Sequence, residues 1–180
     1  MVCQGLSTQK MLDLSWITES FAIGGSFPPT SSEALAHEHR VSAVVDLRGE
    51  ASDDEQLLAR YGIELLHLPT IDFAPISPPR LRQGIEFVTR RMASGQRVLA
   101  HCAQGIGRSA LLALCVLVDR GLAPLEALAL AKARREQLSP SPAQYEAWAA
   151  WLAAWRIEHG ACWRVPTFDQ FKAIAYRHLW

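Results

Sequence analysis

The sequence has 180 residues, and its 18 Lys and Arg balance its 18 Asp and Glu, so the formal net charge at pH 7 is zero. This length suits one domain with a sizeable core, and the even charge balance gives no whole-molecule field that would favour nucleic acid or an anionic membrane. The first residues lack a charged region followed by an apolar stretch, and the longest apolar helix, over residues 110–118, is too short for a bilayer, so we expect neither secretion nor a membrane span.

The predicted strands are short. Two strands are predicted over residues 15–18 and 21–23. The turn-forming pairs Gly24-Gly25 and then Pro28-Pro29 follow the second strand and end this region. Three further apolar runs predict buried core strands: residues 41–48, 63–68 and 97–100. Because helical segments separate these three, we expect an α/β fold whose central, mostly parallel, twisted sheet has four to five strands and helices on both faces.

Helices are predicted mainly in the second half of the chain. Three helices are predicted from prolines near their starts, glycines at their ends and apolar periodicity between them. They run from about residue 78 to 95, from 109 to 121 and from 124 to about 137. The break at residues 139–142 then starts a helix whose aromatic stripe is more typical of core packing than of a binding platform: Tyr145, Trp148, Leu152 and Trp155. We expect residues 1–160 to form one domain, with 161–180 as an amphipathic segment packed on or next to it.

The most informative segment lies between the strand ending at Ala100 and the helix beginning at Ser109. It reads His101-Cys102-Ala103-Gln104-Gly105-Ile106-Gly107-Arg108-Ser109. A tight, glycine-containing turn before a helix directs backbone N–H groups and the positive helix end at one point. That field lowers the pKa of a cysteine at the base of the loop, and the planar arginine fork suits a phosphoryl group. The segment therefore predicts a thiolate nucleophile inside an anion-binding loop.

This stretch resembles the signature loop of the cysteine-dependent protein tyrosine phosphatases, in which His-Cys is followed by five residues, Arg and then Ser or Thr. The resemblance implies that residues 103–107 and Arg108 bind phosphate, that His101 locks the loop by hydrogen bonding, and that Ser109 donates to the departing thiolate. The alternative is a buried strand in which Cys102 merely packs, but packing explains neither Gly105 and Gly107 nor an arginine at the mouth of a buried helix. Cys115, inside the apolar helix, is interpreted as core.

The leaving oxygen needs a proton, so an acid must approach from a second loop. Asp72 lies thirty residues before Cys102, about where the family places its acid, and the form Asp, two residues, Pro resembles the dual-specificity branch. The Trp-Pro-Asp of the tyrosine-specific branch is replaced here by Thr70-Ile71-Asp72. The alternative for Asp72 is a turn-forming aspartate between two prolines.

Other polar residues near the predicted strand ends receive structural interpretations. The rivals to Asp72 follow Gly49 and resemble the capped start of a solvated helix: Asp53, Asp54 and Glu55. Asp46 and Arg48 end a strand and are left out of the catalytic set. Gln144 matches only loosely a polar residue near the family's pocket.

The resemblance implies two chemical steps. Cys102 attacks phosphorus while Asp72 protonates the leaving oxygen, and water then hydrolyses the cysteinyl-phosphate with Asp72 as base. We expect no cofactor and no metal, since the six histidines form no ligand set. Of the four cysteines, Cys3, Cys102, Cys115 and Cys162, the nucleophile must stay reduced, which favours a cytoplasmic protein.

The substrate expected from this resemblance is a phosphoprotein, carrying phosphotyrosine and also phosphoserine or phosphothreonine if the pocket is shallow. Phosphoinositides or small phosphate esters are the alternative, ranked lower because the loop positions Ala103, Gln104 and Ile106 are uncharged. A non-catalytic phosphate-binding scaffold, sulfur transfer and arsenate reduction are the rival activities, and they explain Asp72 less well. The oligomeric state stays open.

Overall fold

The structure is a computed structural model and describes residues 12–179, so Cys3 lies outside the described residues. Its sheet has five strands in the order β1-β2-β5-β3-β4. The strands are β1 (Leu14–Trp16), β2 (Phe21–Gly24), β3 (Val41–Arg48), β4 (Glu64–Thr70) and β5 (Arg97–His101). Only the edge pair β1-β2 is antiparallel, and the other three pairings are parallel. The predicted α/β class and mostly parallel sheet are confirmed.

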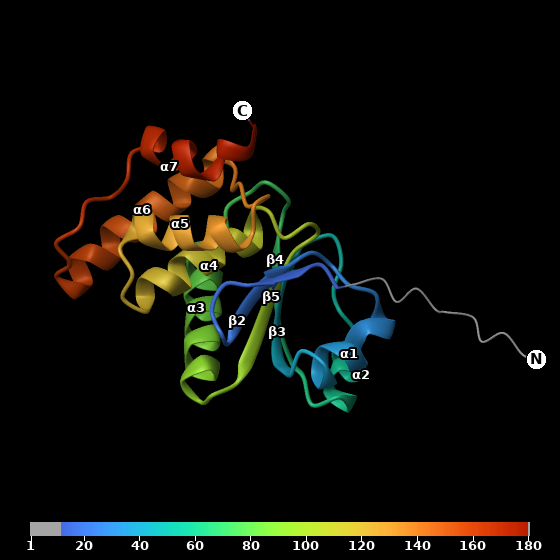
Figure 1. Cartoon of the computed structure of the whole chain (residues 1–180). Coiled ribbons are helices and arrows are strands. Elements are labelled where there is room, and N and C mark those ends of the chain that lie inside the picture. The colour runs from blue at the N-terminus through green and yellow to red at the C-terminus, as the bar shows by residue number, and fades with distance from the viewer. Residues whose placement is uncertain (1–11, 180) are drawn as a thin grey trace, which may run out of the picture.

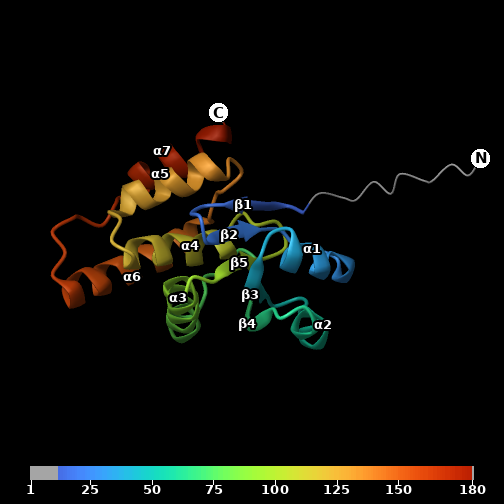
Figure 2. The ribbon, with the colours of Figure 1, turned by 60° about the horizontal axis from the view of Figure 1, so that its bottom comes forward.

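Helices cover both faces of this sheet. On one face lie α1 (Ser32–His37) and α2 (Glu55–Arg60), and the remaining helices lie on the other (Figures 1 and 2). These are α3 (Pro78–Ala93), α4 (Arg108–Asp119), α5 (Pro124–Arg134), α6 (Pro142–His159) and α7 (Phe168–Ala175). Two short 3-10 turns, η1 (Pro29–Ser31) and η2 (Arg177–Leu179), complete the elements.

Successive side chains of a central strand point to opposite faces of the sheet, so the core is divided into two clusters, one under each layer of helices. In β3, Val44 belongs to the smaller cluster under α1 and α2, whereas Val45 belongs to the larger cluster under α3 and α4. Helix α4 is apolar on every side and buried from Arg108 to Val118, as expected for a helix enclosed by other elements. This burial fixes the helix whose first turn follows Cys102.

Some predicted boundaries were wrong by a few residues. Helix α4 begins at Arg108 rather than Ser109, because the Gly107 carbonyl accepts the first helical hydrogen bond, from Leu111. Helix α5 stops at Arg134 rather than near 137, since Arg135 adopts extended backbone. Strand β1 ends at Trp16, two residues before the predicted end.

The carboxyl ends of β2, β5 and β3 meet at one edge of the sheet. In parallel sheets this edge is where ligands bind. Gly24 lies opposite His101 on one side, and Asp46 lies opposite His101 on the other. Within residues 12–179, no helix combines the length and apolar character needed to cross a bilayer.

Candidate active site

The loop from Cys102 to Gly107 joins β5 to α4 and closes around the Cys102 thiol. The Gly105 N–H donates to Cys102 Sγ at 3.3 Å, and Ser109 Oγ lies 3.5 Å from the same sulfur. Gly105 has φ +67°, and a Cβ there would lie 2.5 Å from atoms of both Gly24 and Arg135. Only glycine fits this position, because both the left-handed backbone and the close approach exclude a side chain.

Opposing effects set the pKa of Cys102. Burial of the thiol, which is 3% exposed, is the largest single effect and raises the pKa. Hydrogen bonds from Ser109 and Gly105, together with the Arg108 charge, outweigh burial, so the pKa is lowered overall. Cys115 shows the opposite result, because burial raises its pKa well above the usual value with no such donors. The two thiols therefore differ, because hydrogen bonds and the Arg108 charge favour the thiolate of Cys102, whereas burial disfavours that of Cys115.

Arg108 is a fully buried guanidinium with one unused donor. Its Nη1 and Nη2 donate to the two Glu50 carboxylate oxygens at 2.7 and 2.9 Å, and Nη1 also donates to the Thr70 carbonyl at 2.9 Å. Nε has no hydrogen-bond partner. Burial lowers the pKa of Arg108, and the Glu50 hydrogen bonds with nearby negative charges reverse this effect, so the arginine stays charged. In return Arg108 lowers the pKa of Glu50 to about 2.

Asp72 lies on the loop between β4 and α3, beside the same arginine. Its Oδ1 is 3.1 Å from Arg108 Nη2, and its side chain is half-exposed. Two large apolar neighbours extend into solvent, Ile71 at 78% and Phe73 at 74% exposure. Phe73 has φ +58°, an uncommon conformation for a bulky residue, and its carbonyl accepts a 2.7 Å hydrogen bond from Ser141 Oγ. Residues 71–77, named the acid loop for the role predicted for Asp72, are therefore held in a strained conformation by Ser141, the residue before α6.

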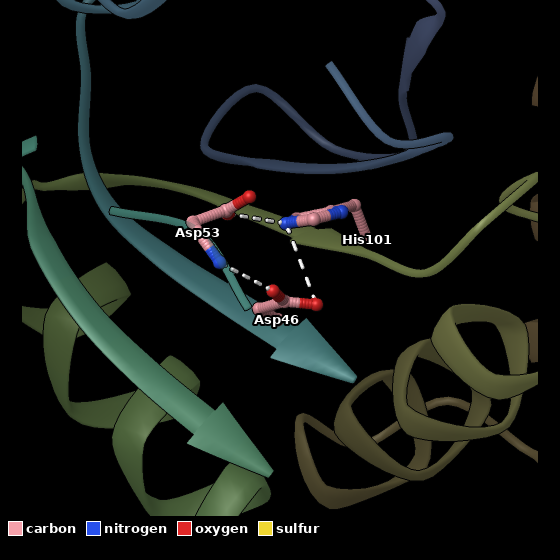
Figure 3. A group of neighbouring side chains, drawn as sticks. All are labelled: Asp46, Asp53 and His101. Carbon is pink, nitrogen blue, oxygen red and sulfur yellow. Dashed lines mark hydrogen bonds and ion pairs between the residues drawn. The ribbon is translucent and has the colours of Figure 1, made fainter. Parts of the chain in front are cut away.

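His101 anchors the start of the signature loop to the segment before α2 (Figure 3). Its Nε2 lies 2.7 Å from Asp53 Oδ2 and 3.8 Å from Asp46 Oδ1, so it donates to Asp53. Spacing alone would allow a metal among these three side chains. Arg48 instead pairs with both carboxylates, at 2.8 and 2.6 Å. The carboxylate oxygens of Asp46 and Asp53 are thus engaged by Arg48 and His101, and this ion-pair network holds the start of the signature loop in place.

The rival acids are occupied elsewhere. Asp53 pairs with His101 and Arg48, and Asp54 caps α2 by accepting from the Leu57 N–H at 2.9 Å, as predicted for the start of a helix. Burial of Asp46 raises its pKa, but the Arg48 hydrogen bonds and the His101 ring outweigh burial, so the pKa is lowered and the carboxylate stays charged. Of Asp72 and the rival acids considered from the sequence, Asp72 is the one that lies against Arg108, an arginine that it shares with Glu50.

Two residues of the site were not predicted from the sequence. Arg135, fully buried, donates to the carbonyls of Gly105 and Gln104 at 2.7 Å each and pairs with Asp13 at 2.8 Å. Glu50 holds the Arg108 fork. Neither position carries a motif, and the only available signal for Glu50 was its place just after a strand end. Gln144, matched only loosely, does lie at the loop, since a Cβ on Gly107 would be 2.6 Å from its Oε1.

Residues 25–154 match the family model "Dual specificity phosphatase, catalytic domain". The chain is 30% identical over 132 residues to the phosphatidylglycerophosphate phosphatase PTPMT1 of Arabidopsis thaliana, covering 71% of this chain and 39% of that protein. It is 32% identical over 87 residues to the phosphatidylglycerophosphatase and protein-tyrosine phosphatase 1 of Mus musculus, covering 47% of this chain and 45% of that protein. The chain thus spans less than half the length of these two relatives.

Solved structures share the architecture. Tk-PTP in its active form superposes with a TM-score of 0.68 at 27% identity, over 74% of this chain and 92% of that one. PTPMT1 superposes with a TM-score of 0.75 at 21% identity, over 82% and 98% respectively, which shows a common fold.

Proposed function

Because the chain belongs to the dual specificity phosphatase catalytic-domain family, we propose that it hydrolyses phosphate monoesters through a cysteinyl-phosphate formed on Cys102. The observation that carries this proposal is the pairing of a buried thiol of lowered pKa with a buried arginine six residues later whose Nε lacks a partner. A thiolate in an electropositive loop is a nucleophile, and a free guanidinium donor is what an incoming phosphoryl oxygen needs.

In the first step Cys102 Sγ attacks phosphorus in line with the leaving oxygen. The sulfur–phosphorus bond forms as the phosphorus–oxygen bond breaks, and the leaving oxygen takes the proton of Asp72. Arg108 and the N–H groups of residues 103–107 bind the non-bridging oxygens, where negative charge is held in the transition state. The ion pair of Asp72 Oδ1 with Arg108 Nη2, at 3.1 Å, supports this role because it keeps the carboxyl group beside the arginine that would bind the phosphoryl group.

In the second step water attacks the cysteinyl-phosphate. Asp72, now a carboxylate, takes the proton from that water. The sulfur–phosphorus bond breaks and Ser109 Oγ, 3.5 Å from the sulfur, donates to the departing thiolate. His101 takes no part in proton transfer in this scheme and keeps the loop in position through Asp53.

The substrate is proposed in two versions. The phosphoprotein expected from the sequence stays a prediction, as does the cytoplasmic location. A phosphate monoester on a glycerolipid is the second candidate, favoured by the names of both curated relatives and by the exposed Ile71 and Phe73 beside Asp72. Exposed apolar side chains at a site mouth suit a bilayer surface.

The reaction is tested by hydrolysis of p-nitrophenyl phosphate in the presence of EDTA. We expect turnover that disappears in Cys102→Ser and is unchanged in Cys162→Ser, which alters an exposed thiol between α6 and α7. Asp72→Asn should lower turnover of phenyl phosphate, a poor leaving group, about 10²- to 10⁴-fold, and turnover of p-nitrophenyl phosphate by less. Vanadate binding without turnover in the unaltered chain would instead support the phosphate-binding scaffold.

The substrate is tested by comparing phosphatidylglycerophosphate in vesicles with a phosphotyrosine peptide. If the lipid is the substrate, Ile71→Ser combined with Phe73→Asn lowers turnover of the vesicles but leaves p-nitrophenyl phosphate unaffected. Asparagine is chosen because it tolerates the left-handed backbone of Phe73. The control is Ile157→Ser on α6, which is also 78% exposed. Peptide turnover far above vesicle turnover would favour the phosphoprotein.

A further inference from the structure

The C-terminal helix α7 lies outside the matched family region and packs over α5 and α6 (Figures 1 and 2). Phe171 is fully buried, with its ring centroid 5.0 Å from that of Tyr145 and 5.9 Å from that of Trp148, both on α6. The helix is therefore part of the described core, joined to the element whose first turn contacts the acid loop.

A bridging turn, residues 138–141, connects the two loops of the site. The Ser139 N–H donates to the Ile106 carbonyl of the signature loop at 3.1 Å. Ser141 Oγ donates to the Phe73 carbonyl of the acid loop at 2.7 Å. Gln144, one turn further on, accepts from the Ser141 N–H and donates to the Ala74 carbonyl at 3.1 Å. A shift of the bridging turn would move the loop that carries Asp72.

The C-terminal segment and Lys132 on α5 hold the bridging turn through hydrogen bonds to the backbone carbonyls of that turn. Tyr176 donates its hydroxyl to the Pro140 carbonyl at 2.7 Å. The fully buried Lys132 donates from Nζ to the carbonyls of Leu138 and Ala175, at 2.8 and 2.6 Å, and lies 2.6 Å from His178 Nδ1. A buried ammonium is stable only when its donors are used, so Lys132 ties the turn to the end of α7.

The acid loop depends on this arrangement more than the signature loop does. The signature loop is also held by Arg135, through the carbonyls of Gly105 and Gln104, and by the His101–Asp53 pair. The contacts described above from Ser141 and Gln144 reach the strained backbone that follows Asp72. Loosening the turn should therefore displace the proton donor first.

We propose that the segment 168–179 is a positioning element for Asp72, with Tyr176 and Lys132 as positioning residues that act through the bridging turn. This inference rests on the proposed function of Asp72. A phosphatase acid matters most when the leaving group is a poor one, since a good leaving group departs with little protonation. The positioning role therefore predicts an effect that depends on the leaving group.

The test compares Tyr176→Phe with Tyr145→Phe. Each removes one hydroxyl that donates to a proline carbonyl, but Tyr145 bonds Pro166, outside the bridging turn, at 2.9 Å. We expect Tyr176→Phe to lower kcat/KM for phenyl phosphate, which reports the step that releases the leaving group, about tenfold, the effect of losing one hydrogen bond. The kcat/KM for p-nitrophenyl phosphate should change much less. KM and vanadate inhibition should stay unchanged, and Tyr145→Phe should match the unaltered chain.

Amide hydrogen exchange over residues 71–76 gives a readout that needs no turnover. Faster exchange there in Tyr176→Phe than in Tyr145→Phe, together with the selective loss of phenyl phosphate turnover, supports the positioning role. Equal exchange in the two variants, or an equal loss of kcat/KM with both substrates, overturns it while leaving the proposed function intact. If turnover by the unaltered chain does not exceed that of Cys102→Ser, both the proposed function and the positioning role are overturned.

Discussion

Replacing Ser109 by alanine should raise the pKa of Cys102 and slow breakdown of the cysteinyl-phosphate. Ser109 is fully buried, and its hydroxyl provides the largest of the hydrogen-bond effects that lower the pKa of this thiol. The backbone donors at Ser109 and Gly105 and the charge of Arg108 remain in the variant. The pKa should therefore rise without returning to the value of an isolated buried thiol.

The size of the shift follows from the geometry. A hydrogen bond to a charged group contributes ~1.5–3 kcal/mol, and the 3.5 Å separation of Ser109 Oγ and Cys102 Sγ places this bond at the weak end. We therefore expect Ser109→Ala to destabilise the Cys102 thiolate by about 1.5 kcal/mol and to raise the pKa of Cys102 in consequence.

The assay is the rate of iodoacetamide alkylation as a function of pH. A background of Cys3→Ser and Cys162→Ser removes other reactive thiols, and Cys115 is fully buried in α4. Because only the thiolate reacts, a raised pKa moves the midpoint to higher pH. An unchanged midpoint would refute the role of the hydroxyl in stabilising the thiolate. Burst kinetics provide a second measurement, since a slower second step lets the phosphoenzyme accumulate.

Three further changes test the support of the site. Glu50→Gln should lower the free energy of unfolding in urea at pH 7 by about 1 kcal/mol, a small value because Glu50 is half-exposed. Since the pKa of Glu50 is lowered from 4.5 to about 2, the stability difference between the two proteins should be lost as the pH falls from 4.5 to 2. A difference that does not depend on pH would contradict the ion pair. Arg108→Lys should weaken vanadate binding at least about tenfold, because lysine lacks both the unpartnered Nε donor and the fork that holds Glu50, and equal affinity would contradict a contact between Nε and the anion. Gly105→Ala should lower the free energy of unfolding by more than about 2 kcal/mol, because the backbone is left-handed and the new Cβ would contact Gly24. The control is Gly62→Ala, where φ is +71° and the space around a Cβ is open, so only the backbone strain remains. Equal losses of stability in the two variants would contradict the close packing at Gly105.

The sequence was most informative where chemistry is local. Cys102, Arg108 and Ser109 come from one continuous stretch, so the turn that brings them together is specified by the residues within it. The same holds for α4, whose uniformly apolar composition predicts a buried helix. The parallel sheet also follows from local patterns, because apolar runs separated by helices allow few other arrangements.

Asp72 is an intermediate case. Its spacing from Cys102 and the following proline indicate an acid loop by resemblance, but its position beside Arg108 depends on β3 separating β4 from β5 in the sheet. The strained backbone at Phe73 has no sequence signal, because bulky residues rarely adopt a positive φ. It becomes understandable only with Ser141 in place.

The remaining supports were decided by tertiary structure. Glu50 reaches Arg108 from 58 residues away, and Arg135 reaches Gly105 from 30 residues away. Such partners are set by which strand and helix ends meet, and a single carboxylate or guanidinium in the sequence does not indicate which of many opposite charges it will face. The sequence by itself determined the fold class, and it predicted the loop that carries Cys102 and Arg108 and an amphipathic C-terminal segment. Only the folded chain decided what holds that loop and how α7 is linked to the loop that carries Asp72. These contacts join residues distant in sequence, and their proximity depends on the packing of the whole domain.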